Sequence, residues 1–290
     1  MSAMAGAPRV CATFRVRAYG RAGRTVAAIF VLVSRLNLLL LLAALVIATD
    51  PPLLPFDVIQ LFLVGAAVPA GIAWLIGRAA EADLEVDADQ LVVQRRRQRI
   101  EVPSAAIVRV RAWRVPLPAP GLALRLRSGR TLPHGIALAD PASLVAALAE
   151  IARVADVPAT THPLLAYARA RAAYRRRWYH ALGKFVLFAL VPTAILFNAH
   201  QHISYGGLLG QYYLLGLGAY LRTFALYWTT ITIYLVLYAS AWRAVAEAVC
   251  LGTAAVAPSR AAGVRRLAET GSALGYYAGA LVILALRFAS

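Results

Sequence analysis

The stretch that decides the fold runs from Val26 to Ala48 and reads VAAIFVLVSRLNLLLLLAALVIA. A bilayer core is about 30 Å thick, and an α-helix needs about 20 apolar residues to cross it. This stretch is long enough, and Arg35 and Asn37 are its most polar residues. Arginines crowd the residues before it, and the cytoplasmic flanks of membrane spans are rich in Arg and Lys. The stretch therefore predicts a first span whose N-terminal side faces the cytoplasm.

Four more apolar stretches follow, and together they predict the class of the protein. They are Phe56–Gly77, Phe185–Phe197, Thr223–Trp242 and Leu274–Leu286. Hydrophobic residues make up 61% of the chain, and the mean hydropathy is +0.66. An average soluble domain is only roughly 45–50% apolar. We therefore expect an α-helical integral membrane protein with about five transmembrane helices, located in a bacterial inner (cytoplasmic) membrane.

The formal net charge of +17 has a simple explanation in such a protein. The chain has 30 Lys and Arg residues, of which Lys184 is the only lysine, and they gather between the apolar stretches. The preference of cytoplasmic loops for basic residues produces a high net charge without any nucleic-acid partner. We therefore do not expect nucleic-acid binding.

The charges also assign each connection to a side of the membrane. The connection 49–55 has no basic residue and is predicted to lie outside, whereas the connection 243–271 is basic and is predicted to lie inside. The uncharged, Gly- and Tyr-rich segment 198–220 is predicted to be an outer loop with an interfacial or re-entrant part. If 203–221 also crossed, the basic connection 243–271 would lie outside, which counts against a sixth span.

Between the second and third spans the pattern changes from continuous apolar runs to alternation. Leu122, Leu124 and Leu126 alternate with Ala123, Arg125 and Arg127, and the residues from Ile107 to Arg111 alternate in the same way. Period-two alternation is typical of half-buried antiparallel strands. Asp140 and Pro141 then supply an N-cap and a first helical residue. A small α+β domain, an antiparallel sheet closed by a C-terminal helix, is predicted at 80–156.

These observations predict five parts along the chain. They are a basic cytoplasmic N-terminal segment at 1–25, a two-helix transmembrane hairpin at 26–77, the inserted cytoplasmic sheet domain at 80–156, a basic juxtamembrane helix at 160–184, and three further transmembrane helices at 185–290.

The sheet domain resembles the bacterial PH-like domains of small membrane proteins over about residues 87–148. The residues that carry the resemblance are the strand patterns Asp89-Gln90-Leu91-Val92-Val93, Ile100-Glu101-Val102-Pro103 and Ile107-Val108-Arg109-Val110, the turns around Pro116–Leu122 and Ser128-Gly129-Arg130, and the helix from Asp140. The resemblance implies a non-catalytic domain beside transmembrane helices that serves interaction or assembly.

Two arginine clusters are candidates for contact with lipid headgroups or with a partner. The clusters contain Arg95, Arg96, Arg97 and Arg99 in the sheet domain, and Arg175, Arg176 and Arg177 before the third span. A basic residue near an anionic leaflet gains about 1 kcal/mol. The first cluster is equally well explained as a solvated hairpin tip.

Three polar residues in apolar stretches are candidates for an intramembrane function. Arg35 lies near the cytoplasmic end of its span and is able to extend to the headgroups, although pairing inside the bundle is the alternative. Asn37 is its close neighbour. Arg222 is the best candidate for a buried polar residue, or else it lies at the outer interface among aromatic residues.

Gly271, Gly275 and Gly279 recur every four residues and therefore share one face of a helix. Such a face lets helices pack closely, so it predicts a helix contact within the chain or with a partner. The alternative is that glycine is simply common in membrane helices.

His200 and His202 are the only candidates for a metal site. Two histidines two residues apart lie on opposite sides of a helix, and neither a carboxylate nor a cysteine is nearby. Zinc sites use three or four ligands. We therefore expect outer-surface histidines without a metal, and no cofactor.

The leading hypothesis is a non-enzymatic accessory or assembly subunit that binds other membrane-protein subunits and anionic phospholipids. No nucleotide-binding or hydrolase motif is present in the sequence. The alternative is a small transporter or lipid-handling protein that uses Arg35, Asn37 and Arg222. A metal or redox subunit based on His200 and His202 is a weaker alternative.

Overall fold

A computed structural model of the chain describes residues 12–47, 53–96, 98–159, 161–174 and 178–289. These residues form two compact units. The first unit takes its residues from 1–32, 70–174 and 248–267, and the second from 33–69, 175–247 and 268–290.

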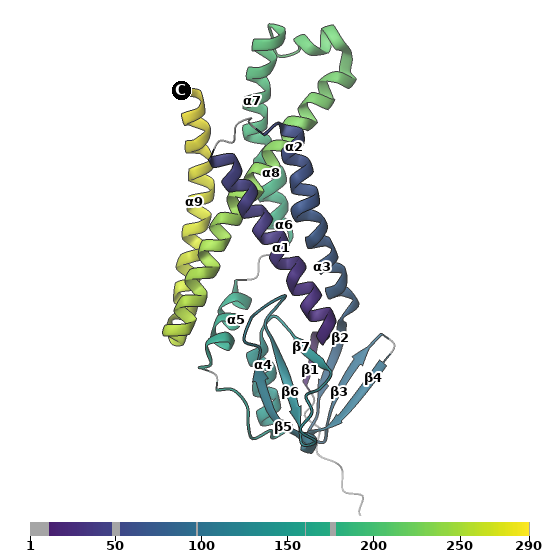
Figure 1. Ribbon diagram of the computed structural model, residues 1–290. Helices are drawn as coiled ribbons and strands as arrows, with labels where there is room; N and C mark the ends of the chain where they lie inside the picture. The colour runs from purple at the N-terminus through teal and green to yellow at the C-terminus, as the bar shows by residue number, and fades with distance from the viewer. Residues whose placement is uncertain (1–11, 48–52, 97, 160, 175–177, 290) are drawn as a thin grey trace, which may run out of the picture. The chain divides into compact units, whose positions relative to one another are not determined.

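The first unit contains an antiparallel half-barrel sheet of seven strands in the order β4-β3-β2-β1-β7-β6-β5 (Figure 1). The strands are β1 (Ala12–Gly20), β2 (Glu81–Val86), β3 (Gln90–Arg95), β4 (Gln98–Pro103), β5 (Ile107–Ala112), β6 (Gly121–Leu126) and β7 (His134–Ala137). An antiparallel sheet between the second and third apolar stretches is thus confirmed.

Two helices cover one face of this sheet and close its core. They are α4 (Pro141–Glu150) and α5 (Pro163–Ala173). Leu84, Leu124 and Leu144 are fully buried between sheet and helices. The predicted start of α4 is confirmed, because the Asp140 carboxylate accepts a hydrogen bond of 3.0 Å from the backbone N–H of Ala142. α5 also belongs to this core, since Leu165 is 1% exposed.

The strand β1 corrects the sequence-based picture of the N-terminus as only a basic segment. Its sequence ATFRVRAYG alternates as a strand does, with Val16 and Ala18 buried in the core. Arg15 lies opposite Asp83 on β2, and Arg17 lies opposite Glu81. Facing opposite charges stabilise a strand pair by about 0.2–1 kcal/mol. These two arginines therefore stabilise the pairing of β1 with β2, although their place before an apolar stretch suggested a membrane flank.

Strands and long helices join without a linker at two places in the first unit. β1 ends at Gly20, and α1 (Arg21–Val46) begins at the next residue. Only Ala80 lies between the end of α3 (Val68–Ala79) and the start of β2. The backbone N–H of Ala18 donates to the carbonyl of Ala80 at 2.7 Å, so the strand pairing extends to the helix end. The sheet and the adjoining helix ends therefore form one continuous backbone framework.

The second unit consists of helices. It contains parts of α1 and α3 and most of α8 (Gly210–Val256) and α9 (Ala261–Ala289). Its other elements are α2 (Pro55–Phe62), the short π-helix η1 (Leu63–Ala67), α6 (Trp178–Leu182), the short π-helix η3 (Gly183–Leu187) and α7 (Phe188–Tyr205). The predicted single helix at 160–184 is thus two helices, α5 and α6, which belong to different units.

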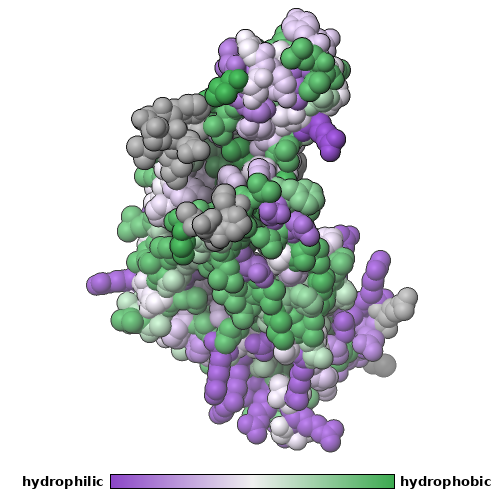
Figure 2. All heavy atoms as spheres, turned by 45° about the horizontal axis from the view of Figure 1, so that its top comes forward, coloured by the Kyte–Doolittle hydropathy of each residue, from purple (hydrophilic) through white to green (hydrophobic). Residues whose placement is uncertain are grey.

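Four helical segments among the described residues are long and apolar enough to cross a membrane. They are Arg21–Val46, Pro55–Ala79, Tyr179–Tyr205 and Gly210–Val256. At most 22% of the most apolar window of each is buried, and Figure 2 shows apolar side chains across much of the visible surface. The fifth predicted span lies in α9, whose final side chains lie outside the described part of the chain, so the count of five stays a prediction.

The segment 198–220 is mostly helical, which corrects the expectation of a loop there, whereas its outer location and its interfacial or re-entrant part stay predictions. α7 continues through Tyr205, and α8 begins at Gly210. Both breaks occur at glycines with positive φ, 73° at Gly206 and 81° at Gly216. The helical piece between them is far shorter than the roughly 20 residues of a span. The described residues therefore give no support to a sixth crossing at 203–221.

A charge placed in β1 tests whether this strand belongs to the core. In the variant Val16→Lys an ammonium group replaces a side chain that is 4% exposed. We expect a loss of about 3 kcal/mol or more, because burying an unpaired charge costs several kcal/mol. Thermal unfolding of the detergent-solubilised protein measures the effect.

Thr13→Lys is the matched control on the same strand. Thr13 is exposed and faces Glu85, so the new ammonium group remains solvated beside a carboxylate. Equal melting temperatures for both variants would contradict the assignment of β1 to the core.

Candidate functional site

An indole ring held between two glycines and a guanidinium group marks the candidate site. Trp113 follows β5, is 5% exposed, and packs on Gly121 of β6 and Gly135 of β7. A Cβ at Gly135 would lie 2.7 Å from Cζ2 of the indole, and one at Gly121 would lie 2.9 Å from Cη2. Only glycine therefore leaves room for the ring.

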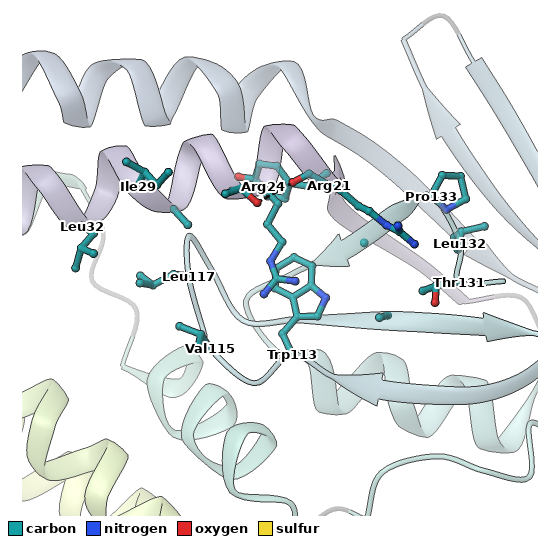
Figure 3. A pocket seen from close by; sticks show the side chains of 15 residues that line it. Arg21, Arg24, Ile29, Leu32, Trp113, Val115, Leu117, Thr131, Leu132 and Pro133 are labelled. Atoms are coloured by element: carbon teal, nitrogen blue, oxygen red, sulfur yellow. Dashed lines mark hydrogen bonds between the residues drawn. The ribbon is translucent and has the colours of Figure 1, made fainter. Parts of the chain in front are cut away.

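The other side of the indole is covered by Arg24, from the first turn of α1. Its Cζ atom lies 3.7 Å from the ring centroid (Figure 3). Such a cation–π contact is worth about 0.5–2 kcal/mol, depending on how far it is desolvated. The stack fastens the start of α1 to the sheet, and it orients the guanidinium group.

Beside this stack lies a cavity of about 670 Å³, a volume typical of small-molecule sites. One wall is the start of α1 with Arg21, Ile29 and Leu32. The facing wall includes Val115 and Leu117 from the loop after β5 (Figure 3). The 15 lining residues include two arginines and no carboxylate. The cavity thus combines uncompensated positive charge with apolar walls, and all of its residues belong to the first unit.

Sequence reasoning missed this cavity. The alternation at Val108 and Val110 predicted β5, but not that Trp113 would face two glycines from other strands. Tyr19 on β1 pairs with Gly135 on β7, and Trp113 donates its backbone N–H to Gly121 at 2.9 Å. Tyr19 and Gly135 are more than 100 positions apart in the chain, so only the strand register reveals the site.

The predicted arginine clusters do not form one site among the described residues. Nη1 of Arg95 lies 2.8 Å from Nε2 of His134, and Arg99 forms an exposed ion pair of 2.6 Å with Glu101. Arg96 is exposed. The remaining members, Arg97, Arg175, Arg176 and Arg177, lie outside the described residues.

The contact with Arg95 fixes the state of His134. A guanidinium group only donates, so Nε2 accepts and the neutral ring carries its proton on Nδ1. Nδ1 is buried and has no hydrogen-bond partner in the described part of the chain. Burial first, and then the charge of Arg95, lowers the pKa of His134 below its usual 6.5. The folded protein therefore favours the neutral imidazole.

The three predicted intramembrane polar residues do not line this cavity. Arg35 is exposed on α1, and Nδ2 of Asn37 donates to the carbonyl of Val33 at 3.0 Å. Arg222 is exposed on α8, which agrees with the surface alternative and not with burial.

Other polar residues of the second unit are buried instead. The Ser34 hydroxyl donates to the carbonyl of Ala66 in the π-helix η1 at 2.9 Å. Gln201 donates to Gln211 at 2.7 Å across the turn between α7 and α8. Both bonds satisfy buried polar groups within the second unit, as burial requires.

An ion cluster near the start of α9 was also missed. Arg243 pairs with Glu247 at 2.6 Å and with Glu269 at 2.8 Å. The Glu269 side chain is 10% exposed. The cluster joins α8 to α9 within the second unit. Glu269 precedes Gly271, the first glycine of the predicted glycine face, by two positions in the sequence.

The glycine face contributes to the same helix pair. Gly275 packs against the Trp242 indole, and Gly279 packs against the Tyr238 ring. The Tyr238 hydroxyl donates to the carbonyl of Gly275 at 2.9 Å. A Cβ at Gly271 would meet no described atom within 4 Å. Two of the three glycines thus accommodate aromatic side chains of α8 within the chain.

His200 and His202 make separate local contacts. Nδ1 of His202 lies 2.9 Å from the carbonyl of Asn198, and the His200 ring packs against Tyr205 and Tyr227. The residues that the structure describes contain no cluster of three or more His, Cys, Asp or Glu side chains.

Comparisons with protein-family models, curated proteins and solved structures found no match for this chain. The resemblance to bacterial PH-like domains therefore stays a prediction. The class that the described residues define is coarser: they contain four helical segments long and apolar enough to cross a membrane, and a separate antiparallel sheet.

Adding a methyl group beneath the indole tests the stack. In Gly135→Ala the new Cβ collides with Trp113, so ring and sheet must separate. We expect a loss of about 1–3 kcal/mol, the usual range for overpacking. Thermal unfolding measures the loss.

Gly20→Ala on the neighbouring strand is the control, because no described atom lies within 4 Å of its Cβ. An equal effect of both substitutions would contradict the packing.

Lowering the pH tests the state of His134. Below about pH 6.5 His134 is protonated in the unfolded chain more readily than in the folded chain. The free energy of unfolding therefore falls as the pH is lowered. We expect His134→Gln to reduce this loss between about pH 7 and 5, since glutamine retains an acceptor for Arg95. Denaturation midpoints across that range provide the measurement. An unchanged pH dependence would contradict the assignment, and His180→Gln, at an exposed histidine, is the control.

Proposed function

We propose that this protein is a non-enzymatic accessory or assembly subunit of a larger complex in a bacterial inner membrane. Its sheet domain lies on the cytoplasmic side and serves as the interaction module. The observation that carries the proposal is the direct passage of β1 into α1 and of α3 into β2. A partner that binds the sheet would thereby be held at a fixed position relative to the first turns of α1.

The physical reason is that neither junction contains a linker: Arg21 of α1 follows Gly20 of β1 directly, and only Ala80 separates α3 from β2. Flexible linkers let a tethered domain explore a wide volume, whereas hydrogen-bonded strands that pass into helices do not. The pairing of Ala18 with Ala80 keeps the two junctions together. Such a domain is suited to hold a cytoplasmic partner at a fixed position beside the start of α1.

Exposed apolar side chains near the kink of α8 also support an assembly role. Tyr213 is 76% exposed and Leu214 is 70% exposed, on the short helical piece before Gly216. A helix too short to cross the bilayer needs lipid or protein to cover such side chains. Ile203, near the end of α7, is 85% exposed as well.

Copurification from native membranes tests the proposal. We expect a tagged chain, extracted in mild detergent, to carry membrane-protein partners in a constant ratio. Val16→Lys should lose them while the protein still fractionates with membranes, because only the sheet is disrupted. Thr13→Lys should retain them. A monodisperse single chain without copurifying proteins, or equal recovery of partners by Val16→Lys, would contradict the proposal.

A further inference from the structure

We propose that the cavity beside Trp113 binds one anionic phospholipid. The proposal takes the membrane insertion of α1 from the proposed function, but it does not depend on the assembly role. The cavity offers positive charge at one end and apolar walls at the other, which is the chemical pattern of such a lipid.

The charged end is formed by Arg21 and Arg24, three residues apart and therefore neighbours on one helix face. No carboxylate lines the cavity, and within the described residues neither guanidinium group forms an ion pair. Arg24 is half-buried and Arg21 is exposed, and two neighbouring arginines without a counter-ion attract an anionic ligand. Stacking on Trp113 occupies only the face of the Arg24 guanidinium, so its in-plane N–H groups remain able to donate to a phosphate.

The apolar end lies further along α1. Ile29 is 53% exposed and Leu32 is 47% exposed, although both line the cavity. Val115, on the facing loop, is 53% exposed. Leu32 follows Arg24 by eight residues, so the two positions are about 12 Å apart along the helix axis. A phosphate at the arginines would thus leave acyl chains against Ile29, Leu32 and Val115.

The position of the cavity favours a lipid over a soluble phosphate compound. Its helical wall consists of the first turns of a segment long and apolar enough to span a membrane. A lipid in the adjoining leaflet has direct access to such a wall, whereas a soluble ligand would leave the apolar end uncovered. An anionic cytoplasmic leaflet also attracts basic residues near its surface.

Lipid binding to the detergent-solubilised full chain provides the test, measured by native mass spectrometry. The probes are phosphatidylglycerol, phosphatidylcholine with the same acyl chains, and glycerol 3-phosphate. We expect phosphatidylglycerol to bind at least about tenfold more tightly than the other two, because the choline cation of phosphatidylcholine opposes the charge of the arginines and glycerol 3-phosphate has no acyl chains to cover the apolar end. Equal binding of both lipids would overturn the proposal, and tight binding of glycerol 3-phosphate would show a soluble-anion site instead.

Two sets of variants place the lipid in the cavity. Arg21→Gln combined with Arg24→Gln should weaken phosphatidylglycerol binding about tenfold. Arg127→Gln combined with Arg169→Gln removes the same charge from exposed positions outside the cavity and should change binding less than twofold, as expected of solvated surface charges. Equal losses in both pairs would indicate nonspecific attraction and overturn the proposal.

A variant at the apolar end tests lipid binding without removing the Arg24–Trp113 stack. Val115→Glu changes an exposed loop residue and leaves both arginines in place. We expect it to weaken phosphatidylglycerol binding while the melting temperature of the lipid-free protein stays unchanged. Unchanged lipid affinity in this variant would overturn the placement of the acyl chains. The assay does not involve other subunits, so its outcome is separate from that of copurification.

Discussion

The pairing of β1 with β2 is the constraint on which the rest of the first unit depends. The two strands are antiparallel, one entering α1 and the other leaving α3. Their hydrogen bonds therefore bring together residues before the first apolar stretch and residues after the second. Without β1 the sheet would be divided into two parts, because β1 lies between β2 and β7. This arrangement makes the start of α1 part of the sheet domain, and it creates the wall of the cavity.

Arginines perform several physically distinct tasks in this chain. Arg15 and Arg17 face carboxylates across a strand pair, and Arg24 covers an indole. Arg243 joins two helices through Glu247 and Glu269. The particular role of each arginine follows from what its element packs against.

Much of the local structure could be predicted from neighbouring residues. The long apolar runs predicted the helices, and the alternating leucines from Leu122 to Leu126 predicted β6. Asp140 before Pro141 predicted the start of α4, because capping depends on the adjacent backbone. β1 has equally clear alternation, but Arg15 and Arg17 also fit a membrane flank. The sequence does not decide between these explanations, since the carboxylates of β2 lie more than 60 residues away.

The sequence by itself determined the long apolar helices and the alternating strands that follow the second of them, because helix and strand periodicities arise within a few consecutive residues. The tertiary structure alone decided the site. Arg24, Trp113, Gly121 and Gly135 come from four different segments, and strand register brings them together. Register depends on pairing between distant strands. That is why the glycines beneath the indole have no local signature, and why the cavity emerged only from the folded chain.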